Sequence, residues 1–273
     1  MESARPLLEL KSISKRFSGV IVADDLSFTV GVGESLGIVG PNGAGKTTLF
    51  GMIGGDIKAD RGEVRLDTRL LNGMDSAERA RAGIGRTYQV PRSFEQMTVF
   101  ENVLVAAQHG AGLRGRSAHE MAQGVIAATG LVRSINRPAG RLGLLDRKRL
   151  ELAKALATSP KVLLLDEVAG GLTDPEVDEL IGVVSESRGA GVSIIWIEHV
   201  VRALVETMER LICFAGGRIV GDGRPLDVLA MDAVRELFLG SEPGDERYLH
   251  GPKPMTGGVE GAKAGDGSET EHG

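Results

Sequence analysis

The sequence contains little that would place the chain outside a cell or across a membrane. It has one cysteine in 273 residues, Cys213, so no disulfide can form within the chain. Cys213 lies in an apolar stretch, 211–214, where we interpret it as core packing. No apolar run approaches the roughly 20 residues of a membrane-spanning helix, and residues 1–10 lack the apolar centre of a signal peptide. We therefore expect a cytosolic chain that reaches a membrane only through a partner.

Positive charge is not in excess, and no internal repeat is evident. The formal net charge is -5, so the composition does not indicate a nucleic-acid-binding surface. Hydrophobic residues make up 42% and charged residues 25%, as in ordinary globular proteins. We expect one domain over residues 6–250, which is long enough to bury a core without disulfides. Residues 251–273 are rich in glycine and charge, so we expect a disordered tail.

Apolar patterns predict an α/β fold with a parallel sheet. Two compact apolar runs, 162–165 and 193–197, are typical of buried central strands, and 176–187 is the expected crossover helix between them. Residues 35–39 predict a third buried strand, which leads into a glycine-rich turn. Other expected elements are short strands in 7–32, a strand or hairpin in 62–71, a hairpin in 211–220, and helices in 102–109 and 147–157. Thr98 and Glu101 have the spacing of a capping box at the start of a helix.

The glycine-rich turn carries the strongest chemical signal in the chain. Residues 40–47, Gly-Pro-Asn-Gly-Ala-Gly-Lys-Thr, match the P-loop pattern between a predicted strand and a predicted helix. Glycines let successive backbone N–H groups turn toward phosphate oxygens. Lys46 can reach the β- and γ-phosphates of ATP, and the Thr47 hydroxyl can ligate Mg²⁺. The predicted nucleotide-binding residues of this loop are Asn42, Gly43, Ala44, Gly45, Lys46, Thr47 and Thr48.

Two carboxylates follow the predicted strand 162–165. Asp166 is placed to hold the Mg²⁺ shell, directly or through water, and Glu167 to polarise the attacking water. A strand that ends in acidic residues is common by itself. Beside a P-loop it predicts the second half of an ATP-hydrolysing site.

From about residue 7 to residue 240 the sequence resembles the ABC ATPase family. The resemblance implies a P-loop NTPase fold with a RecA-like core, an N-terminal antiparallel β-subdomain and an α-helical subdomain inserted at about 92–158. It implies that Gln89 contacts Mg²⁺ and the lytic water, and that His199 touches the γ-phosphate. It also implies that Phe17 stacks on adenine, although a phenylalanine between strands is often only core.

Within that family, two stretches resemble the first of the two ATPases of bacterial branched-chain amino acid importers. They are 83–89 together with 98–103, which contain Arg86-Thr87-Tyr88-Gln89, and 165–172. The resemblance implies a second ATPase subunit, or a second copy of this chain, two membrane permeases and a periplasmic binding protein. It implies a peripheral position on the cytoplasmic face of the inner membrane, with residues 90–97 as the expected permease contact. Related systems carry urea and short amides, and the sequence does not indicate which substrate is carried.

The family's signature, Leu-Ser-Gly-Gly-Gln, is altered in this sequence. The matching stretch is Leu142-Gly143-Leu144-Leu145-Asp146, which lacks the serine hydroxyl that clamps the γ-phosphate on the opposing subunit. Leu145 adds bulk, and we expect Asp146 to bring negative charge toward the triphosphate. Thr173 stands where many relatives have aspartate. We therefore expect asymmetric catalysis, in which the site built on Lys46 and Glu167 hydrolyses ATP and the partner's site does so poorly; the alternative is that this branch tolerates the variant loop.

Two other functions compete with import. An ATPase that drives lipid or polysaccharide export shares the same core, but the Arg86-Thr87-Tyr88-Gln89 stretch argues against it. A soluble ABC protein that acts on DNA or ribosomes needs a long coiled coil or a second cassette, for which 273 residues leave no room. We expect no nucleic-acid partner.

Overall fold

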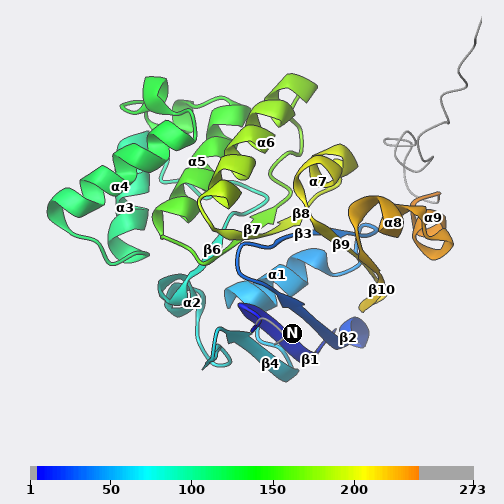
Figure 1. The fold of residues 1–273 in the computed structure, drawn as a ribbon. Coiled ribbons are helices and arrows are strands. Elements are labelled where there is room, and N and C mark those ends of the chain that lie inside the picture. Colours follow the sequence, from blue (N-terminus) through cyan, green and yellow to red (C-terminus); the bar gives the residue numbers. More distant parts are fainter. Residues whose placement is uncertain (1–4, 240–273) are drawn as a thin grey trace, which may run out of the picture.

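The computed structural model describes residues 5–239 and contains two β-sheets with helices around them (Figure 1). The larger sheet has the strand order β10-β9-β3-β8-β7-β6, in which all strands are parallel except β10. Its strands are β3 (Ser35–Val39), β6 (Ile84–Arg86), β7 (Val162–Asp166), β8 (Ser193–Ile197), β9 (Arg210–Ala215) and β10 (Arg218–Gly223). The carboxyl ends of parallel strands lie at one edge of the sheet, which is where ligands bind in such folds.

The smaller sheet is antiparallel and has the order β2-β1-β4-β5. Its strands are β1 (Leu8–Phe17), β2 (Val20–Val30), β4 (Arg61–Leu66) and β5 (Arg69–Leu70). Ser18 and Gly19 connect β1 to β2 with φ angles of 43° and 94°, so this tight connection uses left-handed backbone at both positions. The hairpin brings Phe17 opposite Val20.

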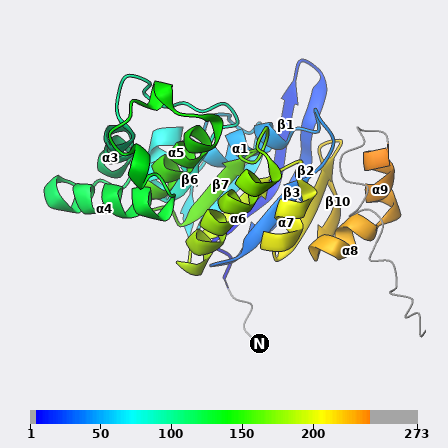
Figure 2. The ribbon, with the colours of Figure 1, turned by 90° about the horizontal axis from the view of Figure 1, so that it is seen from above.

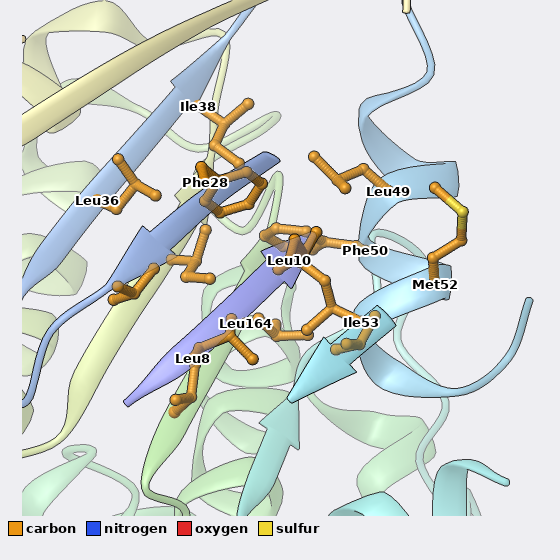
Figure 3. Packing of buried hydrophobic residues seen from close by; sticks show 14 of the residues in the cluster. Leu8, Leu10, Phe28, Leu36, Ile38, Leu49, Phe50, Met52, Ile53 and Leu164 are labelled. Carbon is orange, nitrogen blue, oxygen red and sulfur yellow. The ribbon is translucent and has the colours of Figure 1, made fainter. Parts of the chain in front are cut away.

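Two apolar cores lie on opposite faces of the parallel sheet, because neighbouring residues of a strand point to opposite sides. Leu164 belongs to the core shared with the antiparallel sheet and α1, whereas Leu163 and Leu165 belong to the core under the other helices. Figure 3 shows the first core, where Leu36 and Ile38 of β3 lie beside Phe28 and where Phe50 of α1 lies beside Leu10. The helices around the sheets are α1 (Lys46–Gly54), α2 (Ser76–Ala82), α6 (Asp174–Gly189), α7 (Val201–Thr207), α8 (Pro225–Ala230) and α9 (Asp232–Leu239).

A third core belongs to a group of helices at one side of the molecule (Figures 1 and 2). These helices are α3 (Val99–His109), α4 (Gly115–Ala128) and α5 (Leu144–Ala157), with short 3-10 turns at Val132–Ser134 and Ala139–Arg141. The capping box at the start of α3 is confirmed: the Glu101 N–H donates to Thr98 Oγ1 at 3.2 Å, and the Thr98 N–H donates to Glu101 Oε2 at 2.7 Å.

Several predicted bounds needed adjustment. The helix predicted from residue 147 begins at Leu144, and the crossover helix predicted at 176–187 covers Asp174–Gly189. Helices α2, α4, α7, α8 and α9 were not predicted individually. The predicted tail at 251–273 and residues 240–250 of the predicted domain lie outside the described residues. Within 5–239, no helix combines the length and apolar character needed to cross a membrane.

Candidate nucleotide-hydrolysing site

The P-loop occupies residues 40–45, between the end of β3 and the start of α1. At Gly40, where φ is 153°, a Cβ atom would lie 2.0 Å from the carbonyl oxygen of Phe214. At Gly45, where φ is 102°, it would lie 2.4 Å from Cγ1 of Val22. Only glycine allows these backbone conformations and approaches. No side chain caps α1, so its first N–H groups are available to phosphate.

Lys46 is buried at the base of this loop, with 5% of its surface exposed. Its Nζ donates to the carbonyl oxygens of Gly40 at 2.6 Å and Pro41 at 3.1 Å. Burial lowers the pKa of Lys46, and the nearby carboxylates of Glu167 and Asp166 act in the opposite direction. The amine is therefore a buried cation with two neutral carbonyl partners, which phosphate oxygens can replace.

Asp166 ends β7 and is 1% exposed. Its Oδ2 lies 3.2 Å from Nη2 of Arg86, whereas its Oδ1 is buried and has no hydrogen-bond partner. Burial raises the pKa of Asp166 even though Arg86 opposes the rise. An unsatisfied carboxylate oxygen of this kind is suited to a hard cation, which takes oxygen ligands.

Glu167, Gln89 and His199 meet beside Asp166, although 78 and 32 residues of chain separate Glu167 from the other two. Gln89 Nε2 donates to Glu167 Oε2 at 2.5 Å, and His199 Nε2 lies 2.9 Å from Glu167 Oε1. Each residue follows the carboxyl end of a parallel strand: β6, β7 or β8. The structure thus brings together three of the predicted site residues, with Glu167 between the other two.

A buried charged side chain supports each side of this cluster, and the sequence analysis did not single out either one. Lys148 donates from Nζ to the carbonyl oxygens of Glu167 at 3.1 Å and Gln89 at 3.3 Å. Glu198, which is 2% exposed, accepts from the Ala169 N–H at 2.6 Å and the Trp196 indole Nε1 at 3.2 Å. Burial lowers the pKa of Lys148 and raises that of Glu198.

Phe17 lies at the end of β1, away from the Glu167 cluster, and is 45% exposed. Nζ of Lys15 lies 5.0 Å from the centre of its ring. Val22 of the paired strand β2 contacts Gly45 closely, so this hairpin lies against the P-loop. An exposed aromatic ring beside a phosphate-binding loop is available for stacking, and packing alone does not account for it.

Asp146 has partners within this chain. Its Oδ2 accepts from Ser134 Oγ at 2.9 Å, and its Oδ1 lies 3.7 Å from Nη1 of Arg149. The effect of its charge on a triphosphate bound to the opposing subunit stays a prediction. Gly143 precedes α5 without a side-chain cap, and Leu144 is 47% exposed.

A P-loop at the end of one parallel strand and a Gln–Glu–His cluster at the ends of its neighbours define a nucleotide-hydrolysing protein of the P-loop class. The comparison with protein families identifies it further. Residues 23–170 match the ABC transporter family model, and the chain belongs to that family. It is an ATP-binding and ATP-hydrolysing component of such a transporter.

Known proteins of this family match nearly the whole described fold. The chain is 34% identical over 253 residues to the high-affinity branched-chain amino acid transport ATP-binding protein LivG of Salmonella typhimurium, covering 87% of this chain and 99% of that protein. It is 32% identical over the same coverage to BraF of Pseudomonas aeruginosa, which has the same description. It is 30% identical to the lipopolysaccharide export system ATP-binding protein LptB of Haemophilus influenzae, covering 86% and 98%.

Solved structures agree with this assignment. The ADP conformation of an ATP-binding cassette of an ABC transporter superposes with a TM-score of 0.77 at 28% identity, covering 86% of this chain and 99% of the other. A nucleotide-free cassette gives a TM-score of 0.76, also at 28% identity, with 85% and 98% covered. The predicted α/β fold of an ABC ATPase is therefore confirmed.

Proposed function

We propose that this chain energises the import of branched-chain amino acids or related small amino acids and amides. The observation that carries the proposal is the 32–34% identity to branched-chain amino acid ATP-binding proteins over 99% of their length. The motif Arg86-Thr87-Tyr88-Gln89 supports it, since it is the stretch that most resembles this sub-branch. Export remains the second candidate, because ATP-binding proteins of lipopolysaccharide export reach 30–33% identity.

In the proposed reaction, ATP lies with its phosphates on the P-loop and its adenine on Phe17. The buried ammonium of Lys46 contacts the β- and γ-phosphates. The low dielectric constant around it strengthens their electrostatic attraction. Glu167 orients the attacking water, and Gln89 and His199 hold its carboxylate from two sides. The 2.5 Å and 2.9 Å contacts at Glu167 support these roles, because they fix both carboxylate oxygens before substrate binds.

Mg²⁺ is the metal that these residues would hold. The oxygens available are Oδ1 of Asp166, the Thr47 hydroxyl and the Gln89 side-chain carbonyl. Among residues 5–239 no three His, Cys, Asp or Glu side chains cluster as a metal site. That agrees with a Mg²⁺ ion bound by few protein oxygens and the substrate phosphates. The ion would neutralise charge on the β- and γ-phosphates. This chain would supply the three oxygens named, of which Oδ1 of Asp166 is buried without a hydrogen-bond partner.

The chain works with permease components, and we propose the arrangement expected from its relatives. Two ATPase subunits, this chain with a different one or with its own copy, pair with two permeases at the cytoplasmic face of the inner membrane. A periplasmic binding protein delivers the substrate. Residues 90–97 are the proposed permease contact; Val90 and Phe94 in this segment are 74% and 54% exposed, which leaves apolar surface for a partner.

The altered signature supports unequal sites in a mixed dimer. Gly143 offers no hydroxyl, and Leu144 is exposed at the start of α5 where a phosphate-facing backbone is expected. The site that uses this chain's Lys46 and Glu167 would hydrolyse ATP, and the site capped by residues 143–146 would do so poorly. Equal turnover at both sites would mean that the variant loop acts as a working signature.

Reconstitution tests the substrate. The chain, its partner ATPase and the two permeases of the same transporter would be placed in proteoliposomes. ATP-dependent uptake of radiolabelled leucine, isoleucine and valine would be measured with the binding protein present. We expect uptake with the unchanged chain and none with Lys46→Ala. ATP hydrolysis stimulated by lipopolysaccharide or another lipid, without amino-acid uptake, would replace the import proposal with export.

A further inference from the structure

One face of α5 carries three charged side chains spaced three residues apart. Lys148 and Glu151 are 5% and 2% exposed, and the Lys154 side chain is 17% exposed. Residues with this spacing lie above one another on a helix. Charged groups are rarely buried without partners, so the partners of this face show what it holds.

All three side chains bind backbone or side-chain atoms of the segment that begins at Gln89. Glu151 Oε1 accepts from the Arg92 N–H at 2.8 Å and from Ser93 Oγ at 3.1 Å. Lys154 Nζ donates to the Arg92 carbonyl oxygen at 2.7 Å. Lys148 holds the Gln89 carbonyl oxygen and, alone among the three, also reaches Glu167.

The Glu167 backbone needs this support. Its φ is 49°, a left-handed conformation that residues other than glycine adopt rarely and at a cost. Its N–H donates to the carbonyl oxygen of Ile197 at 2.9 Å, and its own carbonyl oxygen accepts from Lys148 Nζ at 3.1 Å and from the Gly170 N–H at 3.4 Å. These bonds hold the peptide groups on both sides of the Glu167 side chain, and Lys148 makes the shorter of the two contacts to the carbonyl oxygen.

We propose that Lys148 is a positioning residue for hydrolysis, whose amine fixes the carbonyls of Glu167 and Gln89 so that the carboxylate and the amide meet in the orientation that hydrolysis needs. The inference rests on the proposed role of Glu167. It also gives α5 a mechanical role: the helix that begins at the altered signature carries the amine that sets the general base, so displacing its start disturbs Glu167. Errors of about 1 Å in such positioning cost about 100-fold in rate.

The test compares three lysine variants in the dimer that hydrolyses ATP. Lys148→Met removes the ammonium while keeping an unbranched apolar side chain, and Lys148→Arg keeps a cation that can donate to carbonyls. Lys154→Met is the matched control, because the ammonium that it removes lies on the same helix and contacts Glu151 and the Arg92 carbonyl oxygen but not Glu167. We expect Lys148→Met to lower kcat by about 10- to 100-fold with KM for MgATP nearly unchanged. Lys148→Arg should lower kcat less than Lys148→Met does, and Lys154→Met should lower kcat by under about twofold.

Double variants separate positioning from general stability. In a Glu167→Gln background, Lys148→Met should lower the residual rate no further, because the group it positions is already disabled. A further loss in that background, or a normal kcat in Lys148→Met, overturns the inference alone. Wild-type turnover in Glu167→Gln overturns the role of Glu167 and the inference with it. Should Lys148→Met fail to fold, Lys148→Gln takes its place in both backgrounds, because it removes the charge and keeps a polar side chain.

Discussion

Arg86 joins two carboxylates that lie on different sides of it. Its Nη2 lies 3.2 Å from Oδ2 of Asp166, and its Nη1 lies 2.5 Å from Oδ2 of Asp56. The Arg86 side chain is 9% exposed, so its charge compensates Asp166 in a largely dry environment. Arg86 belongs to the Arg86-Thr87-Tyr88-Gln89 stretch and therefore has a physical role in the site: it makes an ionised Asp166 tolerable when no cation is bound.

Removing Arg86 should destabilise the fold. In Arg86→Met the buried carboxylate of Asp166 loses its cationic partner, which costs about 3 kcal/mol in similar cases. Urea unfolding without nucleotide measures the change in the free energy of unfolding. Arg65→Met is the control, because the Arg65–Glu63 pair lies near the surface and should contribute under about 1 kcal/mol. Equal, small losses in both variants would contradict the role given to Arg86.

Asp166→Asn should raise the stability of the nucleotide-free protein at neutral pH. Burial raises the pKa of Asp166 above its ordinary value of 3.8, so the folded state favours the protonated form. The stability that this protonation contributes is fully present below the pKa of Asp166 in the unfolded chain, and it is lost as pH rises through the pKa of Asp166 in the folded protein. At pH 7 the ionised carboxylate lowers the stability of the folded protein. Asparagine removes this destabilisation, and Arg86 keeps its ion pair with Asp56.

Thermal unfolding from pH 4 to pH 8 measures this difference. The Tm of Asp166→Asn should exceed that of the unchanged protein at pH 7, by about 2–4 °C for each kcal/mol relieved, and the excess should shrink toward pH 4. The rise in Tm that MgATP gives should fall in the variant, since an oxygen for Mg²⁺ has been lost. A lower Tm at every pH would contradict the prediction.

Glu167→Gln should separate binding from hydrolysis. The amide keeps the size of the side chain but cannot accept a proton, and loss of a general base typically costs about 10²- to 10⁴-fold in rate. ATP affinity, measured with a fluorescent ATP analogue, should change little. In a mixed dimer the same substitution in this chain should remove most turnover, whereas removing the partner's general base should remove little. Unchanged turnover with Glu167→Gln in the mixed dimer would end the asymmetric interpretation.

Phe17→Ala should weaken nucleotide binding without weakening the fold. Stacking of a base on an aromatic ring contributes about 1–3 kcal/mol, so the Kd of ATP should rise about fivefold or more. The ring is 45% exposed, so the Tm should hardly change. Inorganic tripolyphosphate is the control ligand: its affinity should be the same in both proteins. Equal weakening of ATP and tripolyphosphate binding would mean that the hairpin supports the P-loop and does not contact adenine.

Restoring the signature should raise turnover in the mixed dimer. The quadruple change Gly143→Ser, Leu144→Gly, Leu145→Gly and Asp146→Gln gives Leu-Ser-Gly-Gly-Gln, which returns a hydroxyl and a close backbone to the start of α5. It also releases Ser134 and Arg149 from Asp146, so stability should be measured with turnover. An increase of up to about twofold is expected if the partner's site is limited by this loop, since two sites would then hydrolyse ATP in place of one. No increase in a stable variant would favour a branch in which the variant loop already functions.

Sequence patterns predicted the parts of the site that are continuous in the chain. The P-loop follows from glycines at fixed spacing between a strand and a helix, and Asp166 follows from an apolar strand that ends in acid. The order of the strands was not predictable in the same way, because β3 pairs with β8 and β9, more than 150 residues further along the chain. Apolar periodicity identifies a buried strand and not its neighbours.

The buried supports were also missed for a physical reason. From the sequence, Lys148 and Glu151 are predicted to lie on the solvent-exposed polar face of α5. The sequence alone gives no sign that residues 89–93 cover that face. The same applies to Asp146, whose partner Ser134 precedes it by 12 residues in a short 3-10 turn. One signal was available: Lys148, Glu151 and Lys154 alternate in sign at helical spacing, which indicates an ordered charged face but not its partner.

Trp196 gives the protein a built-in optical reporter. It is the single tryptophan of the chain and is fully buried, and its indole N–H donates to Glu198, the residue immediately before His199. Indole emission responds to the polarity and hydrogen bonding around the ring. Its spectrum therefore responds to changes around Glu198 and His199 in the native chain, so stopped-flow fluorescence can report such changes during nucleotide binding without a dye or an added cysteine.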